Sequence, residues 1–374
     1  MSPRYTLPDS IGNGSSNTLR TLLVWGLPVL AWGFIFLGLW FFNREEAPET
    51  PAAQPASAAS EGQPQATPPA GQPAPAQQPG QSGVAAPQTA TPAGQPQTVQ
   101  TAAPAPIAPS APYDFTGAAA TVGLPKEANC ATGILVDAAS RKVLWAKGAD
   151  KAVPIASMTK MMTLLLAEEA IAAQRVTRET VIPVSVAAYK IGGSQVWLDP
   201  RESFPLGELL KAVAIKSAND AAYLVGEYLG QGDIATFVKQ MNERARQLGM
   251  THTTFYEPHG LGDSQKRSNL ASAHDMVLLG ERLLGYPEVM RLTSTKRDSF
   301  RNGKTELKNH NNLVFQGVPG VDGLKTGYTA AAGYCVTISC QRGGRRLLAC
   351  VTGFSSARDR DAFCKALLDW GYAR

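Results

Sequence analysis

The sequence is poor in residues that bind metal ions. Among its 374 residues there are four histidines and five cysteines, and no cysteine stands in a Cys-x-x-Cys pair or beside a histidine at ligand spacing. His274 precedes Asp275 where a helix is expected to begin, which fits a helix start better than a catalytic pair. We therefore predict no metal site, no dithiol redox site and no cofactor.

The cysteines are also too few for a disulfide framework, and their odd number means that they cannot all pair. Most fall in apolar segments that we expect to be strands, where a cysteine serves as a small core residue. One disulfide among the last four stays open at this point. The five residues are Cys130, Cys335, Cys340, Cys350 and Cys364.

Basic residues are missing from a long N-terminal stretch. No Lys or Arg occurs between Arg44 and Lys126, and 51 of the 66 residues from 47 to 112 are Ala, Pro, Gln or Gly. Such a chain cannot bury enough apolar surface to fold, so residues 43–121 are predicted to form a disordered linker. Its neutral, Gln-rich composition argues against a nucleic-acid-binding tail.

Residues 22–42 form an apolar run without a charged residue. These 21 residues are long enough to cross a bilayer as a helix. Large aromatic and charged residues follow the run, so we predict an uncleaved anchor and not a signal peptide. Arg4 and Arg20 precede it, which predicts that residues 1–21 are cytoplasmic and that the rest lies outside, in the periplasm or on the cell-wall side.

Residues 122–374 are numerous enough for one domain with a sizeable core. Two strands are predicted within 132–146, mainly helices from 176 to 286, three strands within 321–354 and a closing helix over 357–370. This order predicts an α+β domain: a five-stranded antiparallel sheet flanked by helices, with a helical lobe beside it. The block carries more basic than acidic residues, which suits anionic wall polymers or carboxylate-ended substrates.

Two turns are predicted in that domain. The stretch Phe300–Thr305 has the Asn-Gly pair of a hairpin with a type I′ turn. Gly343 and Gly344 lie between the last two predicted strands.

The stretch Pro154-Ile-Ala-Ser-Met-Thr-Lys-Met-Met-Thr163 precedes an apolar run and predicts a buried helix that begins near Ser157. Ser157 and Lys160 would then share one face. A serine hydroxyl becomes a good nucleophile when a base takes its proton, and a buried lysine can be that base because burial disfavours its charge. The alternative is a serine at a helix start with a solvated lysine nearby.

Two further short motifs follow at a distance. Ser217-Ala-Asn219 offers a hydroxyl that could relay a proton and an amide that could hold a peptide group; alternatively it is an ordinary helix cap. Lys325-Thr326-Gly327 ends a predicted strand, where a cation and a hydroxyl suit a carboxylate and glycine allows close approach of a backbone. Its alternative is a strand end with a solvated lysine.

The order of the three motifs, with the stretches around them, resembles the penicillin-recognising serine enzymes, and specifically the low-molecular-mass D-alanyl-D-alanine carboxypeptidases. The resemblance covers nearly all of residues 132–372. It also includes Pro258-His-Gly-Leu261, Asn309-His-Asn-Asn312 and Val321-Asp-Gly-Leu-Lys-Thr-Gly-Tyr328. It implies a β-lactamase/DD-peptidase-like fold, peptidoglycan stem pentapeptides as substrates, release of their terminal D-alanine, a part in cell-wall remodelling, and β-lactams as inhibitors.

The resemblance also assigns roles. Ser157 would form the acyl-enzyme, Lys160 would accept its proton, and Ser217 would pass the proton onward. Five further residues would bind the substrate. Asn219 holds the acylated peptide, Lys325 and Thr326 hold the carboxylate with Gly327 beside them, and Tyr328 shares an oxyanion hole with the N–H of Ser157.

Other functions remain open. Truncated relatives that cleave cross-links make a DD-endopeptidase the nearest alternative. A β-lactamase would need a Glu-x-x-Leu-Asn loop, which the sequence lacks, and a non-catalytic penicillin-binding wall module should have lost one motif, whereas all three are intact. Many such carboxypeptidases continue into a β-rich domain and a C-terminal anchor; here we expect the N-terminal span to take the place of that anchor.

The first testable prediction concerns anchoring. The full chain should fractionate with membranes, because residues 22–42 would span the bilayer, and protease added from outside should cut within 47–112 to release a soluble, active fragment. Immunoblots with N-terminal and C-terminal tags measure both. Sequencing that placed the mature N-terminus beyond Arg44 would show that the span is cleaved.

Overall fold

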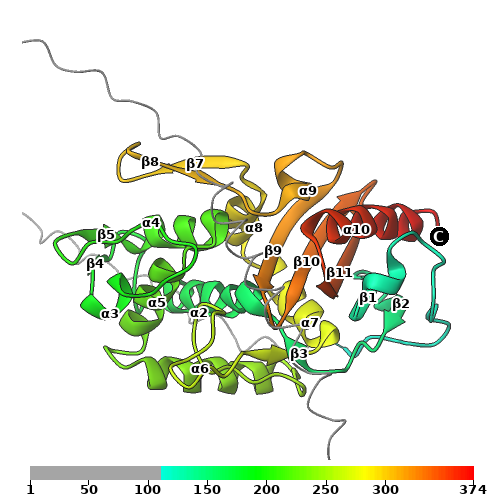
Figure 1. Cartoon of the computed structure of the whole chain (residues 1–374), viewed down its shortest axis with the longest axis horizontal. Coiled ribbons are helices and arrows are strands. Elements are labelled where there is room, and N and C mark those ends of the chain that lie inside the picture. The colour runs from blue at the N-terminus through cyan, green and yellow to red at the C-terminus, as the bar shows by residue number, and fades with distance from the viewer. Residues whose placement is uncertain (1–110) are drawn as a thin grey trace, which may run out of the picture. The chain divides into compact units, whose positions relative to one another are not determined.

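The computed structural model describes residues 111–374, and the fold of this part is shown in Figure 1. The predicted tail, the predicted span at 22–42 and the predicted linker up to residue 110 lie outside the described residues, so they stay predictions. The last part of that linker was predicted wrongly: Asp114 and Ala119 form bridges with Lys142 and Trp145, and Tyr113 is buried, so the folded domain begins before residue 122. Within residues 111–374, no helix has both the length and the apolar character needed to cross a membrane.

One five-stranded antiparallel sheet is the frame of the domain, as the sequence predicted. Its order is β2, β1, β11, β10, β9, so the first two strands join the last three through the pairing of β1 with β11. The strands are β1 (Thr132–Asp137), β2 (Lys142–Lys147), β9 (Val321–Thr329), β10 (Gly333–Arg342) and β11 (Arg345–Phe354).

Helices cover both faces of this sheet. All six residues of β1 are buried: Ile134 and Val136 belong to the hydrophobic cluster on one face, and Leu135 to the cluster on the other. Successive side chains of β1 thus point to opposite faces of the sheet, and both faces are covered. On one face α10 (Ala357–Tyr372) packs on β10 and β11, and on the other α7 (Ala273–Leu284) packs on β1, β10 and β11.

The helical lobe is built around α2 (Lys160–Ala172), which runs through its middle in Figure 1. Nine of its thirteen residues are buried, which explains why apolar residues surround the helix and do not form one stripe. The helices around it lie within residues 176–286, the stretch predicted to be mainly helical, except the last, which follows that stretch. They are α3 (Val186–Tyr189), α4 (Leu206–Lys211), α5 (Asn219–Leu229), α6 (Ile234–Gln247) and α8 (Pro287–Ser294).

Short elements complete the domain, and most were not predicted because two or three residues carry no periodic pattern. Two short strand pairs join distant segments: β3 (Val153–Pro154) with β6 (Leu270–Ala271), and β4 (Val181–Pro183) with β5 (Ser203–Pro205). The remaining elements are the 3₁₀ turns Glu127–Asn129 and Ala156–Thr159, the π-helical turn Ala212–Lys216, α9 (Asn312–Phe315), and the hairpin β7 (Arg297–Phe300) with β8 (Thr305–Lys308).

Both turn predictions agree with the structure. The hairpin at 297–308 exists, Asn302 and Gly303 both have the positive φ that a type I′ turn requires, and the Lys304 N–H donates to the Arg301 carbonyl oxygen at 3.2 Å. Gly343 and Gly344 do turn between β10 and β11, both with positive φ.

All five cysteines are free and buried, so the disulfide that the sequence left open is not formed. Their role as small core residues is confirmed.

The second testable prediction concerns the cluster under α10. Phe363 is fully buried and its ring lies 5.6 Å from that of Trp145 and 5.7 Å from that of Phe354. Phe363→Ala should lower the free energy of unfolding by about 3–5 kcal/mol, because it removes apolar contact and leaves a cavity.

Urea unfolding of residues 111–374, followed by circular dichroism, measures this change. Lys365→Ala, an exposed position on the same helix, is the matched control and should cost less than about 1 kcal/mol. Equal losses for both variants would contradict the assignment of Phe363 to the core.

Candidate active site

Ser157 lies in the 3₁₀ turn Ala156–Thr159, directly ahead of α2, so the predicted helix is present but its α-helical part begins at Lys160. Ala156 has a φ of 46°, a strained conformation for a residue with a side chain. The carbonyl oxygen of Ala156 accepts a hydrogen bond of 2.8 Å from the Thr159 hydroxyl. This tight turn directs the Ser157 hydroxyl into a cavity instead of along the helix surface.

Lys160 is fully buried, and its Nζ lies 3.0 Å from the Ser157 Oγ. The same Nζ donates to the Asn219 Oδ1 at 2.6 Å and to the carbonyl oxygen of His259 at 2.5 Å. A neutral amine has two N–H groups and one lone pair. When the neutral amine donates both N–H groups to these two acceptors, its lone pair is available to the Ser157 hydroxyl.

Burial lowers the pKa of Lys160 well below its usual value of 10.5, and the positive charge of Lys325 lowers it further. The carboxylates of Glu257 and Asp220 act in the opposite direction. The solvated-lysine alternative is therefore wrong, and Lys160 has the environment that a general base requires.

Ser217 and Asn219 lie where the π-helical turn 212–216 meets α5. Ser217 has a φ of 61° and lines the same cavity as Ser157. Residue 218 caps α5 without a side-chain hydrogen bond, so the ordinary-cap alternative for this motif is wrong. Besides accepting from Lys160, Asn219 donates from Nδ2 to the carbonyl oxygen of Gly192 at 2.8 Å, which fixes its amide group between two segments.

Lys325 is not at a strand end, which corrects the sequence interpretation. It lies in the middle of β9, is 2% exposed, and donates from Nζ to the carbonyl oxygen of Thr326 at 3.0 Å. Burial lowers the pKa of Lys325 to about 7, and the nearby Arg360 guanidinium acts in the same direction. The lysine that was expected to keep its charge thus changes its charge near neutral pH.

Gly327 is required by the protein's own packing. A Cβ at this position would lie 2.7 Å from the carbonyl oxygen of Ile155 and 2.8 Å from the Cys335 Sγ. Glycine was predicted here because it would let a substrate backbone approach. The segment that leads to Ser157 occupies part of that space.

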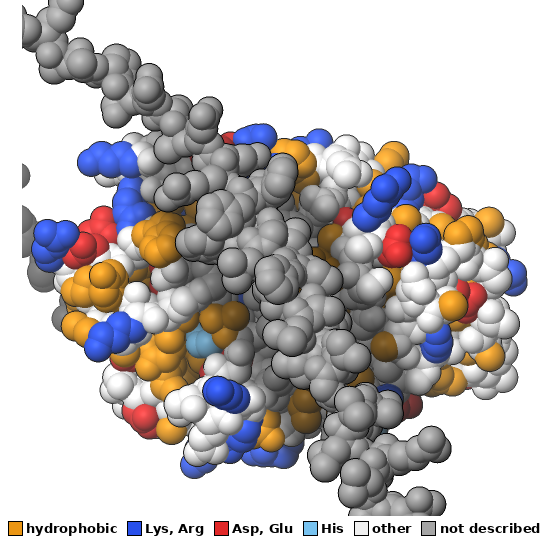
Figure 2. Space-filling model, viewed as in Figure 1, with side chains coloured by type: hydrophobic (Ala, Val, Ile, Leu, Met, Phe, Trp, Pro, Cys, Tyr) orange, Lys and Arg blue, Asp and Glu red, His pale blue; other side chains and the backbone are white. Residues whose placement is uncertain are grey.

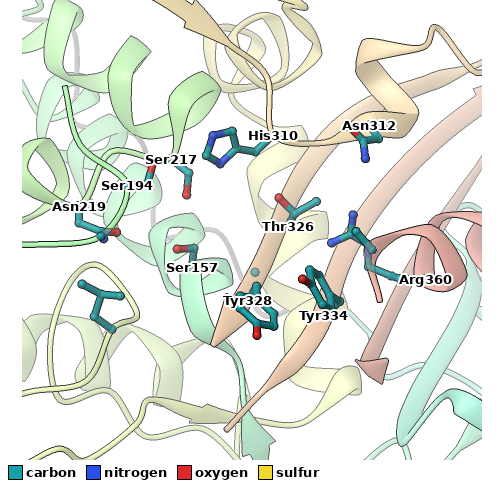
Figure 3. A pocket seen from close by; sticks show the side chains of 14 residues that line it. Ser157, Ser194, Ser217, Asn219, His310, Asn312, Thr326, Tyr328, Tyr334 and Arg360 are labelled. Carbon is teal, nitrogen blue, oxygen red and sulfur yellow. The ribbon is translucent and has the colours of Figure 1, made fainter. Parts of the chain in front are cut away.

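The predicted residues meet at one cavity of about 320 Å³, shown in Figure 3. Lys160 and Lys325 lie beneath it and do not line it. The lining residues that were predicted are Ser157, Ser217, Asn219, Thr326, Gly327 and Tyr328. An oxyanion hole formed by the N–H groups of Ser157 and Tyr328 stays a prediction.

Several residues around the cavity had been given no role from the sequence. Arg360, near the start of α10, is 3% exposed and donates to the carbonyl oxygen of Cys335 at 3.3 Å. Burial and then Lys325 lower the pKa of His310 to about 4, so this ring is neutral at pH 7. Asn312 also lines the cavity, and with His310 it comes from the quoted Asn-His-Asn-Asn stretch, which was the available signal.

A buried carboxylate fixes the loop that supplies the His259 carbonyl group. Glu257 accepts from the N–H groups of His259 (2.6 Å) and Gly260 (2.8 Å) and from the Asn269 Nδ2 (2.8 Å). Burial raises the pKa of Glu257, but its His259 and Gly260 partners outweigh burial, so the net pKa is lowered and the group is a carboxylate. Gly260 lies so close to Ala156 that a Cβ there would be 2.1 Å from its carbonyl oxygen.

The arrangement is suited to acyl transfer. It combines a serine hydroxyl, a desolvated amine beside it, and two further buried basic side chains, Lys325 and Arg360, of which Arg360 also forms an ion pair of 2.7 Å with Asp361. Among residues 111–374, no group of three or more His, Cys, Asp or Glu side chains could hold a metal ion.

Comparison with known proteins agrees with this chemistry. A family model described as D-alanyl-D-alanine carboxypeptidase matches residues 118–356. Over 246 residues, the chain is 37% identical to D-alanyl-D-alanine carboxypeptidase DacF of Bacillus subtilis and 35% identical to DacC of Escherichia coli. These matches cover 65% and 64% of this chain, and 62% and 60% of the relatives, so the chain spans about three fifths of their length.

Solved structures show the same fold. Penicillin-binding protein D2 from Listeria monocytogenes, in its ampicillin-bound form, is 29% identical with a TM-score of 0.61, over 67% of this chain and 99% of that one. D-alanyl-D-alanine carboxypeptidase DacD from Francisella tularensis is 25% identical with a TM-score of 0.62, over 71% of this chain and 74% of that one.

The third testable prediction separates the two buried lysines. Lys160→Arg should slow acylation of Ser157 by at least about a hundredfold, because arginine keeps a charge and offers no lone pair at neutral pH. Below about pH 7, where Lys325 is protonated, Lys325→Arg should slow capture of carboxylate-bearing reagents by roughly tenfold, because there only the shape of the cation changes. Stopped-flow acylation by a β-lactam measures both.

The pH dependence provides the control. The Lys325 cation is present below about pH 7 and is lost as the pH rises through that value, so the rate of capture should fall on the alkaline side. In Lys325→Arg this alkaline decline should disappear. A decline that persisted unchanged in the arginine variant would contradict the role of Lys325.

Proposed function

Because this chain belongs to the D-alanyl-D-alanine carboxypeptidase family, we propose that it is a serine-type carboxypeptidase that removes the terminal D-alanine of peptidoglycan stem pentapeptides. The observation that carries this proposal is the contact of 3.0 Å between the Ser157 Oγ and the buried Nζ of Lys160, which also has the Asn219 Oδ1 and the His259 carbonyl oxygen as acceptors.

The reaction begins with attack of the Ser157 Oγ on the carbonyl carbon of the penultimate D-alanine, while the hydroxyl proton passes to Lys160. Ser217 relays that proton from Lys160 to the nitrogen of the terminal D-alanine, and the C–N bond then breaks to release D-alanine and leave an ester on Ser157 and a neutral Lys160. Water hydrolyses this ester, with Lys160 again accepting the proton. Both serines line one cavity and Lys160 lies directly beneath, which supports this sequence of steps.

The substrate carboxylate binds at the positive end of the cavity. Thr326 offers a hydroxyl there, and Arg360 and the protonated Lys325 offer charge. A carboxylate would in turn favour the protonated form of Lys325, because an opposite charge nearby raises a lysine pKa. The site is therefore selective for peptides with a free C-terminus.

Inhibition by β-lactams follows from the same chemistry, since these compounds also present a carboxylate and an acylating carbonyl group. The Listeria protein D2, similar to this chain, has been solved in ampicillin-bound and cefotaxime-bound forms. We further propose that the domain acts outside the cytoplasm on the cell wall, tethered by residues 22–42; the uncharged run and the arginine bias support this placement.

The fourth testable prediction is the direct test. Wild-type protein should release D-alanine from a stem pentapeptide and should gain the mass of one β-lactam, whereas Ser157→Ala should do neither. Coupled D-alanine assays and intact-protein mass spectrometry measure these outcomes.

A cross-linked dimeric muropeptide is the comparison substrate. If the dimer were cleaved and the pentapeptide were not, the protein would be an endopeptidase. Labelling that survived in Ser157→Ala would overturn the nucleophile assignment.

A further inference from the structure

One tryptophan side chain projects into solvent from the helical lobe. Trp197 lies between α3 and β5 and is 74% exposed, whereas its neighbours Val196 and Leu198 are each 1% exposed. A tryptophan ring is large and rigid and is apolar over most of its area. The two buried neighbours anchor the segment, so the ring is presented outward from a fixed backbone.

That backbone has a conformation that residues with a side chain avoid. Trp197 has a φ of 58°, in the left-handed region. On one side, the fully buried Asp220 carboxylate accepts from the N–H groups of Val196 at 3.2 Å and Leu198 at 3.1 Å. On the other side, the Arg301 guanidinium donates to the carbonyl oxygens of Val196 and Trp197 at 2.5 Å each. Two charged side chains thus hold the segment in the form that exposes the indole.

Trp197 borders a surface hollow of about 520 Å³. The other residues that line the hollow are all charged: Asp199, Arg201, Glu202, and Arg301 from the turn between β7 and β8. Asp199 accepts from the Nε and Nη2 of Arg201 at 2.8 and 2.6 Å, and Glu202 is paired with Arg301 in the same way. Figure 2 shows hydrophobic side chains beside basic and acidic ones at this end of the lobe, where α3, β4 and β5 lie in Figure 1.

The charges of the hollow balance. Hydrogen bonds from Arg201 lower the pKa of Asp199, and hydrogen bonds from Arg301 lower the pKa of Glu202, so both acids are carboxylates at pH 7. Two carboxylates and two guanidinium groups leave no net charge, which gives no attraction for an anionic lipid surface. Their remaining donors and acceptors suit a neutral ligand with many hydroxyl groups.

A saccharide ring has these properties. One face of a pyranose presents C–H groups, which pack on an aromatic ring because the face of that ring carries partial negative charge. The edge of the pyranose presents hydroxyl groups, which can bind the free lone pairs of Asp199 and the free N–H groups of Arg201. A purely apolar ligand would use the indole of Trp197 alone.

The hollow is within reach of a substrate at Ser157. Ser194, three residues before Trp197, lines the active-site cavity, and its carbonyl oxygen accepts from the Asn219 N–H at 2.7 Å. Three extended residues span at most about 11 Å, and a five-residue peptide spans at most about 18 Å. Figure 3 shows Ser194 and Asn219 on the side of Ser157 opposite to Arg360. A stem peptide with its terminal carboxylate near Arg360 therefore has its other end, which is attached to sugar, on the side of Ser194.

We propose that this hollow binds a sugar ring of the glycan strand that carries the stem peptide, with the sugar stacked on Trp197 and its polar edge on Asp199 and Arg201. This inference rests on the proposed function and extends it. The glycan becomes part of what the protein recognises, in addition to the peptide end that reacts at Ser157.

The fifth testable prediction compares a free stem pentapeptide with the same pentapeptide attached to its disaccharide. For the full-length wild-type protein, kcat/KM for D-alanine release should be roughly tenfold higher with the disaccharide, mainly through a lower KM, because the sugar adds contacts far from the reacting bond. Trp197→Ala should remove this advantage. Trp197→Phe, which keeps an aromatic face, should retain most of it. Acylation of Ser157 by a β-lactam, which involves no sugar, reports that each variant is folded.

Tyr228→Ala is the matched control. Tyr228 is an exposed aromatic residue at the opposite end of α5 from Asp220, and it does not line the hollow. This variant should keep the wild-type advantage. A pentapeptide with a cyclohexylacetyl group in place of the disaccharide tests the chemistry, because it offers an apolar ring without hydroxyl groups and should show little of the gain.

Each outcome decides one part. Equal kcat/KM for the two substrates in the wild type, or an advantage that survives in Trp197→Ala, would overturn the saccharide site. An equal gain from the cyclohexylacetyl peptide would overturn the assignment to a sugar. Loss of a dimer in Trp197→Ala, measured by sedimentation and without a change in kinetics, would overturn it in favour of contact between two copies.

Failure of the proposed function gives a different result. Release of D-alanine from neither substrate would overturn the proposed function. The saccharide site is then decided by binding of the free disaccharide, followed by saturation-transfer NMR: binding to the wild type that is lost in Trp197→Ala supports it, and equal binding or no binding overturns it.

Discussion

The burial of one amine is the constraint on which the site depends. Lys160 is placed by the start of α2, and its two hydrogen-bond acceptors come from the start of α5 and from the loop after residue 257. Removing an ammonium from water is costly, and the protein limits that cost by favouring the neutral amine. The Glu257 carboxylate, with its donors from His259, Gly260 and Asn269, is what fixes that loop in place.

The second buried lysine, Lys325, strengthens the preference of Lys160 for its neutral form. Lys325 lies on the sheet side and Lys160 on the lobe side, and a positive charge on Lys325 disfavours one on Lys160. The sheet and the lobe meet close to both lysines: β9 packs on the turn that carries Ser157, and Gly327 lies against Ile155. The different roles proposed for the two lysines thus depend on how the lobe and the sheet meet.

Local patterns allowed much of this to be predicted from the sequence. The five strands of the main sheet and the larger helices lie where they were predicted. Their positions could be predicted because burial in the sheet or in the lobe leaves an apolar pattern in each segment. Ser157 and Lys160 were paired correctly because three residues of helix suffice to bring them together.

What could not be predicted depends on contacts between distant segments. The acceptor for Lys160 from residue 259 is a backbone carbonyl group, which leaves no mark in the side-chain sequence. Arg360 reaches the cavity from the last helix, and the burial of Lys325 arises only when β9 is covered. The positive φ of Ala156 was equally invisible, because nothing about alanine signals it.

The pairing of β1 with β11 determines when the protein can fold during its synthesis. Thr132 lies opposite Thr352, across 220 residues of chain, and their hydroxyl groups are 2.7 Å apart. Until the ribosome has made β11, strand β1 has no partner on its β11 side. The sheet is then incomplete, and the apolar residues of β1 cannot be fully buried. Closing so long a loop is slow, and the nascent domain must be kept from aggregating for nearly the whole of its synthesis. Ser157, the proposed nucleophile, is translated early, but its surroundings are complete only when the last strand has been made.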